Sequence, residues 1–249
     1  ILVFFTVYAA SCLKTCGQLF STLFGASYQS MLIVGAIFVL VYTILGGFLA
    51  ESASDFMQSI VMIIALVSVL ILGTIHAGGI DAVMANAQAI SGYFSLSEIA
   101  NPVTHEAGMQ LVENGVPVFG EALPYPFLTI ASMLAWGLGY FGMPQVLLRF
   151  MAIRKASELK KSRRIATVWV IISLFAAVAI GIIGRAMLPS AETLLTKGGA
   201  ENVFVLMSET LLHPVLAGVI MAGILAATIS SSDSYLLIAS SALANDVFK

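Results

Sequence analysis

The sequence predicts an all-α fold, that of a polytopic helical membrane protein. Hydrophobic residues make up 59% of the chain and charged residues only 10%, whereas soluble domains carry about 25% charged residues. Several stretches reach the roughly 20 mostly apolar residues that a spanning helix needs. The basic residues gather in one short stretch, which is typical of a cytoplasmic loop. These features predict a multi-pass protein of a cell membrane, bacterial in type, with membrane lipid around it and no nucleic-acid partner.

Six segments are long and apolar enough to cross a bilayer, namely 1–23, 28–50, 56–76, 124–148, 165–188 and 214–243. We expect residues 1–249 to form a single transmembrane domain fragment, in which helices within 1–76 and 124–246 flank a polar loop at 77–123. The chain opens on Ile1, without Met and without the features of a signal peptide. We therefore expect an internal piece of a longer protein that lacks its N-terminal and C-terminal helices.

The positions of Lys and Arg predict the orientation of these helices. Seven of the eleven basic residues lie between 149 and 164, so this loop is expected on the cytoplasmic side. Alternation then puts the loops 77–123 and 189–213 outside. The first of these carries four glutamates and no Lys or Arg, and the stretch 201–212 within the second predicts a short interfacial helix.

The fourth predicted span is rich in residues that weaken helices. Its sequence AWGLGYFGMPQVLLRF contains Gly137, Gly139, Gly142 and Pro144. Glycine lowers helix propensity and proline removes a backbone hydrogen bond. An unwound segment at membrane depth is tolerated where it lines a cavity or is buried in protein, and it marks transporter binding sites. The alternative is a continuous, kinked helix whose glycines allow close packing.

The last span, 214–243, contains a polar cluster within an apolar helix. At about 100° per residue, Ser230, Asp233 and Ser234 share one face, with Ser231 at its edge. Ser232 falls on the opposite side, where a hydroxyl can bond back to its own helix. A carboxylate at this depth is a functional-site hypothesis by default.

Two interpretations of this cluster remain open from the residues alone. Hydroxyl, carbonyl and carboxylate oxygens are hard donors, which suit a small hard cation such as Na⁺. A bound cation would offset the cost of burying those oxygens. Alternatively, Asp233 is protonated or bonded to neighbouring helices, and the serines hold helices together.

Asp55 belongs to a second polar island, in the sequence YTILGGFLAESASDFMQS at 42–59. One interpretation is helix capping, with Asp55 accepting from early N–H groups and Gln58 reaching back, as in a capping box. The other is a carboxylate at the cytoplasmic mouth of an ion path.

Lys14 is a charge deep within the first span, too far from its ends for easy snorkelling. We expect it to pair with Asp233, with a carbonyl, or with a helix outside this sequence. Lys14 and Asp233 are therefore the candidate intramembrane charges.

Three motifs, at 42–59, at 136–152 and at GILAATISSSDSYLLIASSALANDVFK, resemble the sodium:solute symporter family in order and spacing. The likeness covers nearly the whole chain and weakens in the loops 77–123 and 189–213. It implies a fold of two inverted five-helix repeats, like that of the leucine transporter. The segments within 1–76 would be the last three core helices of repeat one, and those within 124–246 the first three of repeat two.

The resemblance also implies a sodium site. Its ligands in the eighth core helix correspond to the carbonyl of Ala227 and the hydroxyls of Ser230 and Ser231, completed by a helix outside this sequence. The family's functional aspartate at the inner end of the fifth core helix corresponds to Asp55, which we expect among the sodium-binding residues. Na⁺ would be the coupling ion, with no organic cofactor.

The family's substrate-proximal positions correspond to Trp136, Gly139, Tyr140 and Pro144. The implied activity is sodium-coupled symport of a small organic solute, for which we expect L-proline. The chain departs from the family at Ala53-Ser54-Asp55, where Trp-Thr-Asp is frequent, and at Met143-Pro144-Gln145, where a Gln-Pro-His-like run is expected. These departures bear on solute identity more than on sodium coupling.

Three alternatives stay open. In the first, the solute is another amino acid, pantothenate or a carboxylate. In the second, the chain is the symporter-like sensory domain of a larger signalling protein. In the third, protons replace sodium as the coupling ion and act through Asp233. A long soluble domain after residue 249 would favour the sensor. We do not expect an enzyme, because the sequence has no nucleophile–base pair and no complete metal-ligand cluster.

Overall fold

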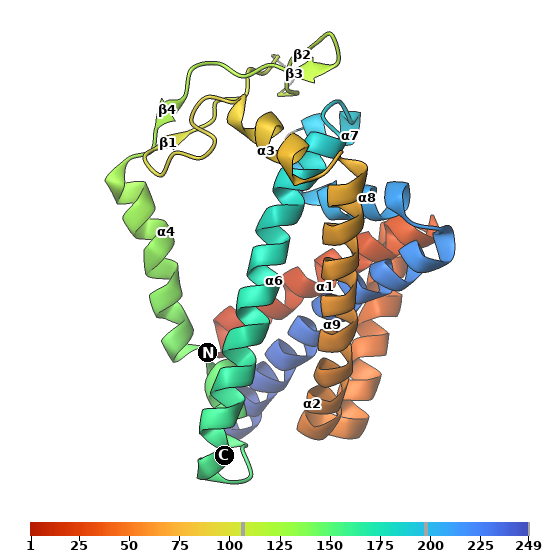
Figure 1. Cartoon of the computed structure of the whole chain (residues 1–249). Coiled ribbons are helices and arrows are strands. Elements are labelled where there is room, and N and C mark those ends of the chain that lie inside the picture. The colour runs from red at the N-terminus through yellow and green to blue at the C-terminus, as the bar shows by residue number, and fades with distance from the viewer. Residues whose placement is uncertain (106–107, 197–198, 249) are drawn as a thin grey trace. The chain divides into compact units, whose positions relative to one another are not determined.

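The computed structural model describes residues 1–105, 108–196 and 199–248 (Figure 1). The chain forms two compact units. The first unit contains residues Ile1–Ala65, Met143–Arg154 and the chain from Gly218 onward, and the second contains Leu66–Gly142 and Lys155–Ala217. Among the described residues helices predominate and the strands are only two residues long, so the predicted all-α class is confirmed.

Helices α1 (Leu2–Phe24) and α2 (Tyr28–His76) follow one another at the start of the chain. Gly25 ends α1 with φ 63°, a left-handed conformation that glycine adopts without steric cost. The 49 residues of α2 are interrupted at Gly47, where φ is 51° and ψ is −145°. This conformation is open essentially to glycine alone.

The break in α2 corrects the prediction of two separate spans at 28–50 and 56–76. Residues 51–55, which lie between the two predicted spans, are helical, and the interruption lies at Gly47. The 49-residue element would be about 74 Å long if straight, more than twice the thickness of a hydrocarbon core. The arms on either side of Gly47 are each long enough for one crossing.

The predicted break in the fourth span is confirmed. Helix α4 (Phe127–Gly139) gives way to the 3₁₀ turn η1 (Tyr140–Gly142). Met143 is then extended, with φ −70° and ψ 118°, and α5 (Pro144–Met151) begins with proline in its first turn. Proline is well suited there, because the N–H that it lacks would have no partner within the helix.

The remaining long helices are α6 (Leu159–Met187) and α9 (Pro214–Ala242), which continues into a π-helical turn, η4 (Leu243–Val247). The short helix α8 (Val203–Leu211) confirms the helix predicted within 201–212. In the second unit α6 packs on α8 and on the end of α2. A Cβ at Gly184 would collide with the Val203 side chain, so the absence of a side chain permits this close approach.

The polar loops contain the rest of the regular structure. The first loop holds α3 (Ile80–Gln88) and four two-residue strands: β1 (Glu98–Ile99), β2 (Val112–Glu113), β3 (Val116–Pro117) and β4 (Leu123–Pro124). β1 pairs antiparallel with β4, and β2 with β3. The other short elements are η2 (Ala156–Glu158), α7 (Glu192–Leu195) and η3 (Gly199–Asn202).

In the described part of the chain, five helical stretches are long and apolar enough to cross a membrane. They are Leu2–Ser21, Tyr28–His76, Phe127–Met151, Ala156–Met187 and Pro214–Val247. The broken α2 accounts for the difference from the six spans predicted.

The first unit is held together by two small apolar clusters in which α9 packs between other helices (Figure 1). Phe5 of α1 packs with Ile238 of α9. Cys16 of α1, Val39 of α2 and Ile229 of α9 form the second cluster. These contacts bracket the polar residues of α9 along the helix and fix which face of α9 meets α2.

Candidate functional site

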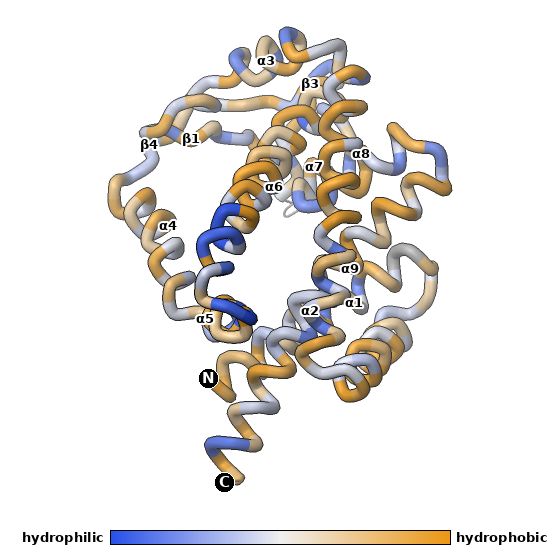
Figure 2. Tube along the Cα trace, turned by 60° about the horizontal axis from the view of Figure 1, so that its bottom comes forward, coloured by the Kyte–Doolittle hydropathy of each residue, from blue (hydrophilic) through white to orange (hydrophobic). Residues whose placement is uncertain are grey.

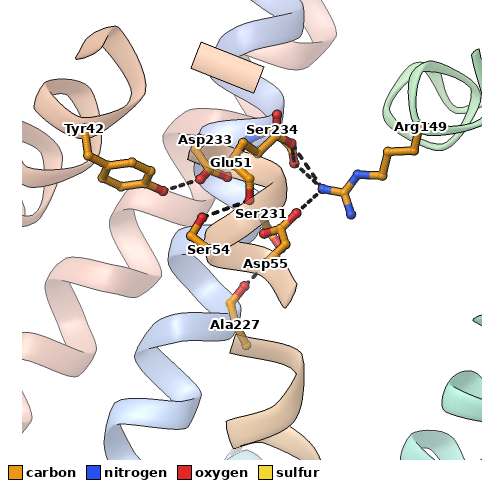
Figure 3. Close-up of polar contacts among 9 residues, drawn as sticks. All are labelled: Tyr42, Glu51, Ser54, Asp55, Arg149, Ala227, Ser231, Asp233 and Ser234. Atoms are coloured by element: carbon orange, nitrogen blue, oxygen red, sulfur yellow. Dashed lines mark hydrogen bonds and ion pairs between the residues drawn. The ribbon is translucent and has the colours of Figure 1, made fainter. Parts of the chain in front are cut away.

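The first unit contains a buried polar cluster between α2 and α9 (Figure 3). Its most buried members are Glu51, Asp233 and Ser234, with exposed fractions of 3%, 0% and 5%. The Ser234 hydroxyl donates a hydrogen bond to Glu51 Oε1 and so links the two helices directly. Burying such groups is costly unless they are hydrogen-bonded or paired, so the cluster requires internal partners.

Arg149 of α5 supplies the positive charge of the cluster. Its Nη2 lies 3.1 Å from Glu51 Oε1 and also forms an ion pair with Asp55 Oδ2. The same nitrogen lies 3.1 Å from Ser234 Oγ. Glu51 and Asp55 are four residues apart on α2, which puts both carboxylates on one face of the helix. One guanidinium therefore joins α5, α2 and α9.

Asp233 is bonded from the other arm of α2. The Tyr42 hydroxyl donates to Asp233 Oδ2, and the Ser234 backbone N–H donates to Asp233 Oδ1 at 2.7 Å. Tyr42 lies before the break at Gly47 and Glu51 lies after it. The conformation of Gly47 thus allows both arms of α2 to reach neighbouring residues of α9.

The cluster has more acidic groups than basic ones. Glu51, Asp55 and Asp233 contribute three carboxyl groups, and Arg149 is the cation that pairs with the first two. Glu51 Oε2 and Asp55 Oδ1 are buried and have no hydrogen-bond partner among the described residues. An excess of buried acceptor oxygens favours a cation or protons at this position.

The predicted sodium ligands lie on α9, just before the cluster in sequence (Figure 3). The Ser231 hydroxyl donates to the Ala227 carbonyl oxygen at 3.2 Å. If each oxygen lay about 2.4 Å from a hard cation, this separation would subtend about 84° at the ion, near the octahedral angle. Ser230 is partly exposed, and its hydroxyl bonds to no described residue. The assignment of Ala227, Ser230 and Ser231 as sodium ligands stays a prediction, with which the separation of the Ala227 and Ser231 oxygens is compatible.

The predicted division of hydroxyls around α9 is confirmed for Ser232. Its hydroxyl donates to the Thr228 carbonyl oxygen at 2.9 Å, and the residue is fully buried. Thr228 itself donates to the Ile224 carbonyl oxygen at 3.1 Å. Both hydroxyls are satisfied within their own helix, as expected for serine and threonine on an apolar helix face.

The capping interpretation of Asp55 is wrong. Asp55 lies in the helical interior of α2, well past Gly47, and its carboxylate pairs with Arg149. Gln58 Oε1 is buried and bonds to no group in the described ranges, so no capping box forms. The local sequence resembles a helix start because the pattern Asp-x-x-Gln, at Asp55 and Gln58, occurs within the helical part of α2 that follows Gly47.

The expectation that Lys14 pairs with Asp233 is also wrong. Asp233 is occupied by Tyr42 and by the Ser234 N–H. Lys14 is exposed on α1 and forms no ion pair within residues 1–105, 108–196 and 199–248. Pairing with a helix outside this sequence remains a prediction.

The predicted substrate residues lie around the break between α4 and α5. Trp136 and Tyr140 are 73% and 55% exposed, and their rings meet edge to face with centroids 6.4 Å apart. Gly139 is the last residue of α4. These three residues belong to the second unit, whereas Pro144 opens α5 in the first. The two rings offer an accessible aromatic surface beside interrupted backbone.

Three members of the cluster were not expected from the sequence: Tyr42, Glu51 and Arg149. Arg149 was assigned to the cytoplasmic basic loop, which is a matter of topology alone. The sequence could have indicated Glu51, because this acidic residue lies in an apolar helix, four residues before Asp55 and so on the same helix face. Tyr42 had no comparable signal, since an aromatic residue in a membrane helix is ordinary.

The described residues contain no group of three His, Cys, Asp or Glu side chains arranged to hold a metal ion. Cys12 and Cys16 are free thiols. The site is therefore built from hydrogen-bonding oxygens and one guanidinium.

Comparison with known proteins agrees with the resemblance seen in the motifs. The profile of the sodium:solute symporter family matches residues 1–249. Sodium/proline symporter 2 of Staphylococcus saprophyticus is 37% identical over all 249 residues. The sodium/proline symporter of Staphylococcus aureus strain USA300 is 35% identical over the same length. No solved structure matches the chain.

The chain covers 43% of the length of each of these two relatives, so it spans less than half of the proteins it resembles. The match nevertheless extends over the whole chain, loops included. It agrees with the apolar helices of a multi-pass membrane protein and with a transport rather than an enzymatic role. The chain belongs to the sodium:solute symporter family.

Proposed function

We propose that the protein to which this chain belongs is a sodium-coupled symporter of a small organic solute, and that the solute is L-proline. The observation that carries the proposal is the oxygen-rich face of α9 beside a cluster with more carboxylates than cations. Such a face attracts a small hard cation. Relatives named sodium/proline symporter support the choice of ion and solute.

In this mechanism sodium binds to the carbonyl of Ala227 and the hydroxyls of Ser230 and Ser231, together with a helix outside this sequence. Ser231 exchanges its internal hydrogen bond for the cation while keeping its oxygen in position. Asp55 contributes negative charge nearby and is held by Arg149. Sodium binding stabilises one conformation of the protein, and the solute binds that conformation more tightly.

The solute would meet the aromatic pair of Trp136 and Tyr140. Their exposed rings present apolar surface to a pyrrolidine ring. Backbone groups freed between Gly139 and Pro144 are available for the charged groups of an amino acid. Because binding equilibria are linked, sodium raises solute affinity by the same factor as solute raises sodium affinity.

The test is uptake of radiolabelled L-proline by the complete protein, expressed in a proline-uptake-deficient bacterium with and without an inward sodium gradient. Uptake that requires the gradient supports both coupling ion and solute. If the protein is present in the membrane but carries no proline, the solute assignment is wrong. Other amino acids, pantothenate and carboxylates are then tested in the same cells.

Proton coupling through Asp233 is a second candidate, because this buried carboxyl group accepts a hydrogen bond from Tyr42 and has no ion-pair partner among the described residues. It predicts uptake that is independent of sodium, increases at low pH and is abolished by Asp233→Asn. Uptake that follows sodium and is insensitive to a proton gradient would exclude it.

A further inference from the structure

The cytoplasmic start of α6 carries a dense group of positive charges. The stretch 149–164 contains seven Lys and Arg residues and a single acid, Glu158. Four of the cations lie in the first turns of α6 and are exposed: Lys160, Lys161, Arg163 and Arg164. None of the four forms an ion pair with a residue that the structure describes. The positive-inside rule accounts for the sign of this loop but not for where the charges lie around the helix.

These charges occupy one side of α6. With Lys160 as the origin and about 100° per residue, Arg163 lies at about −60°, Arg164 at about +40° and Lys161 at about +100°. The arc is centred close to Lys160 and Arg164. These basic residues define what we call the basic arc.

Several exposed apolar residues further along α6 fall on the same side, although Ile165 and Ile172, also exposed, lie at about +140° and +120°. Ile171, Phe175 and Val178 lie at about +20°, +60° and 0° on the same scale. They are 62%, 69% and 66% exposed. Figure 2 shows the hydrophilic start of α6 passing into a hydrophobic run along the helix. The basic arc is therefore continued by an apolar stripe on the same helix face.

The opposite side of α6 packs within its own unit. Ala176 and Ile180 lie at about 160° and −160° on the same scale, and each is only 2% exposed. Ile183 is near Gly73 of α2, and Gly184 is near Met207 of α8. The stripe and the arc thus lie within the part of α6 that this unit leaves exposed.

The dimensions of this face match one lipid molecule. Arg164 and Val178 are 14 residues apart, about 21 Å along the helix, and one leaflet is about 20–22 Å thick when its headgroup region is included. A headgroup at the basic arc would therefore have its acyl chains along Ile171 and Phe175. Phosphate oxygens are bound well by Lys and Arg.

We propose that this face of α6 is a binding site for an anionic phospholipid of the cytoplasmic leaflet, with the headgroup phosphate at the basic arc and an acyl chain on the apolar stripe. The proposed site shares no residue with the polar cluster of α2, α5 and α9. We expect the site to distinguish lipids by the charge of their headgroups, because zwitterionic lipids offer the same acyl chains without net negative charge.

The test uses the complete protein in nanodiscs that contain a small fraction of phosphatidylglycerol with a photoreactive acyl chain. We expect labelling to concentrate in 165–178 and to be much weaker with a phosphatidylcholine probe of the same chain. In the Lys160→Gln/Arg164→Gln variant, the probe fraction for half-maximal labelling should rise by about fivefold for each cation removed, roughly 25-fold in total.

The matched control is Arg154→Gln/Lys155→Gln, which removes the same charge from the preceding loop and should label like the unaltered protein. Equal labelling by the two probes, or an equal effect of both double variants, would overturn the proposal. So would the absence of label in 165–178, since another protein segment would then cover the stripe. The comparison of probes in the unaltered protein decides the proposal even if a variant fails to assemble.

Discussion

Substitution of Ser231 by alanine tests whether its hydroxyl is a sodium ligand or only a structural group. In the structure the Ser231 hydroxyl makes one hydrogen bond, to the Ala227 carbonyl oxygen of its own helix at 3.2 Å. Alanine is a better helix former than serine by up to about 0.5 kcal/mol. A serine that bonds back to its helix contributes little to stability. We therefore expect Ser231→Ala to fold as well as the unaltered protein.

The expected loss is in sodium affinity. A neutral hydrogen-bonding group that interacts with a charge contributes about 1.5–3 kcal/mol, and a water molecule can replace part of that. A net loss of about 1.4 kcal/mol corresponds to a tenfold weaker equilibrium. The sodium concentration for half-maximal uptake should thus rise about tenfold, with a smaller change in maximal rate.

The measurement is initial uptake by the complete protein at a series of sodium concentrations, with Ser232→Ala as the matched control. Ser232 is the adjacent residue and makes the equivalent bond, to the Thr228 carbonyl oxygen at 2.9 Å, but its side chain lies about 100° further around α9, on the side opposite Ser230. The control should keep the original sodium dependence. An unchanged sodium dependence in Ser231→Ala, or an equal shift in both variants, would remove Ser231 from the site.

Three further predictions concern the polar cluster. In a double-mutant cycle of Glu51→Gln and Arg149→Gln on thermal stability, we expect a coupling energy of about 1 kcal/mol, which is near the upper end of the values for surface ion pairs. The value is this small because Arg149 is 47% exposed and solvent screens the pair. Additive effects of the two substitutions would mean that the pair contributes nothing. Tyr42→Phe leaves a buried Asp233 oxygen without its hydroxyl donor and should lower the free energy of unfolding by about 1–3 kcal/mol; a melting temperature equal to that of the unaltered protein would contradict this. Asp55→Cys should abolish most sodium-driven uptake at normal membrane levels, and full uptake at reduced levels would show that this carboxylate is only structural.

The sequence by itself determined the membrane class, most of the helix boundaries and the broken segment before α5. Those predictions rest on local chemistry. Apolar length identifies a span whatever it packs against, and glycine with proline weakens the helix at 137–144 in any surroundings. The separation of Ser231 from Ser232 likewise follows from helical geometry alone.

Helix capping at Asp55 and the pairing of Lys14 with Asp233 were incorrect for a common reason. Both depend on which groups from distant parts of the chain are near, and local spacing does not contain that information. Asp55 looks like a cap until Arg149, 94 residues later, is seen to hold it. Lys14 and Asp233 have opposite charges, yet the Asp233 carboxylate accepts a hydrogen bond from Tyr42 instead.

Only the tertiary structure decided the composition of the polar cluster. The single residue Gly47, at φ 51°, changes the direction of α2, and residues on either side of it then reach Asp233 and Ser234. A sequence pattern gives the face of one helix, whereas the partner of that face is set by how several helices pack. The sequence determined which oxygens α9 can offer, and packing determined that Glu51 and Arg149 lie beside them.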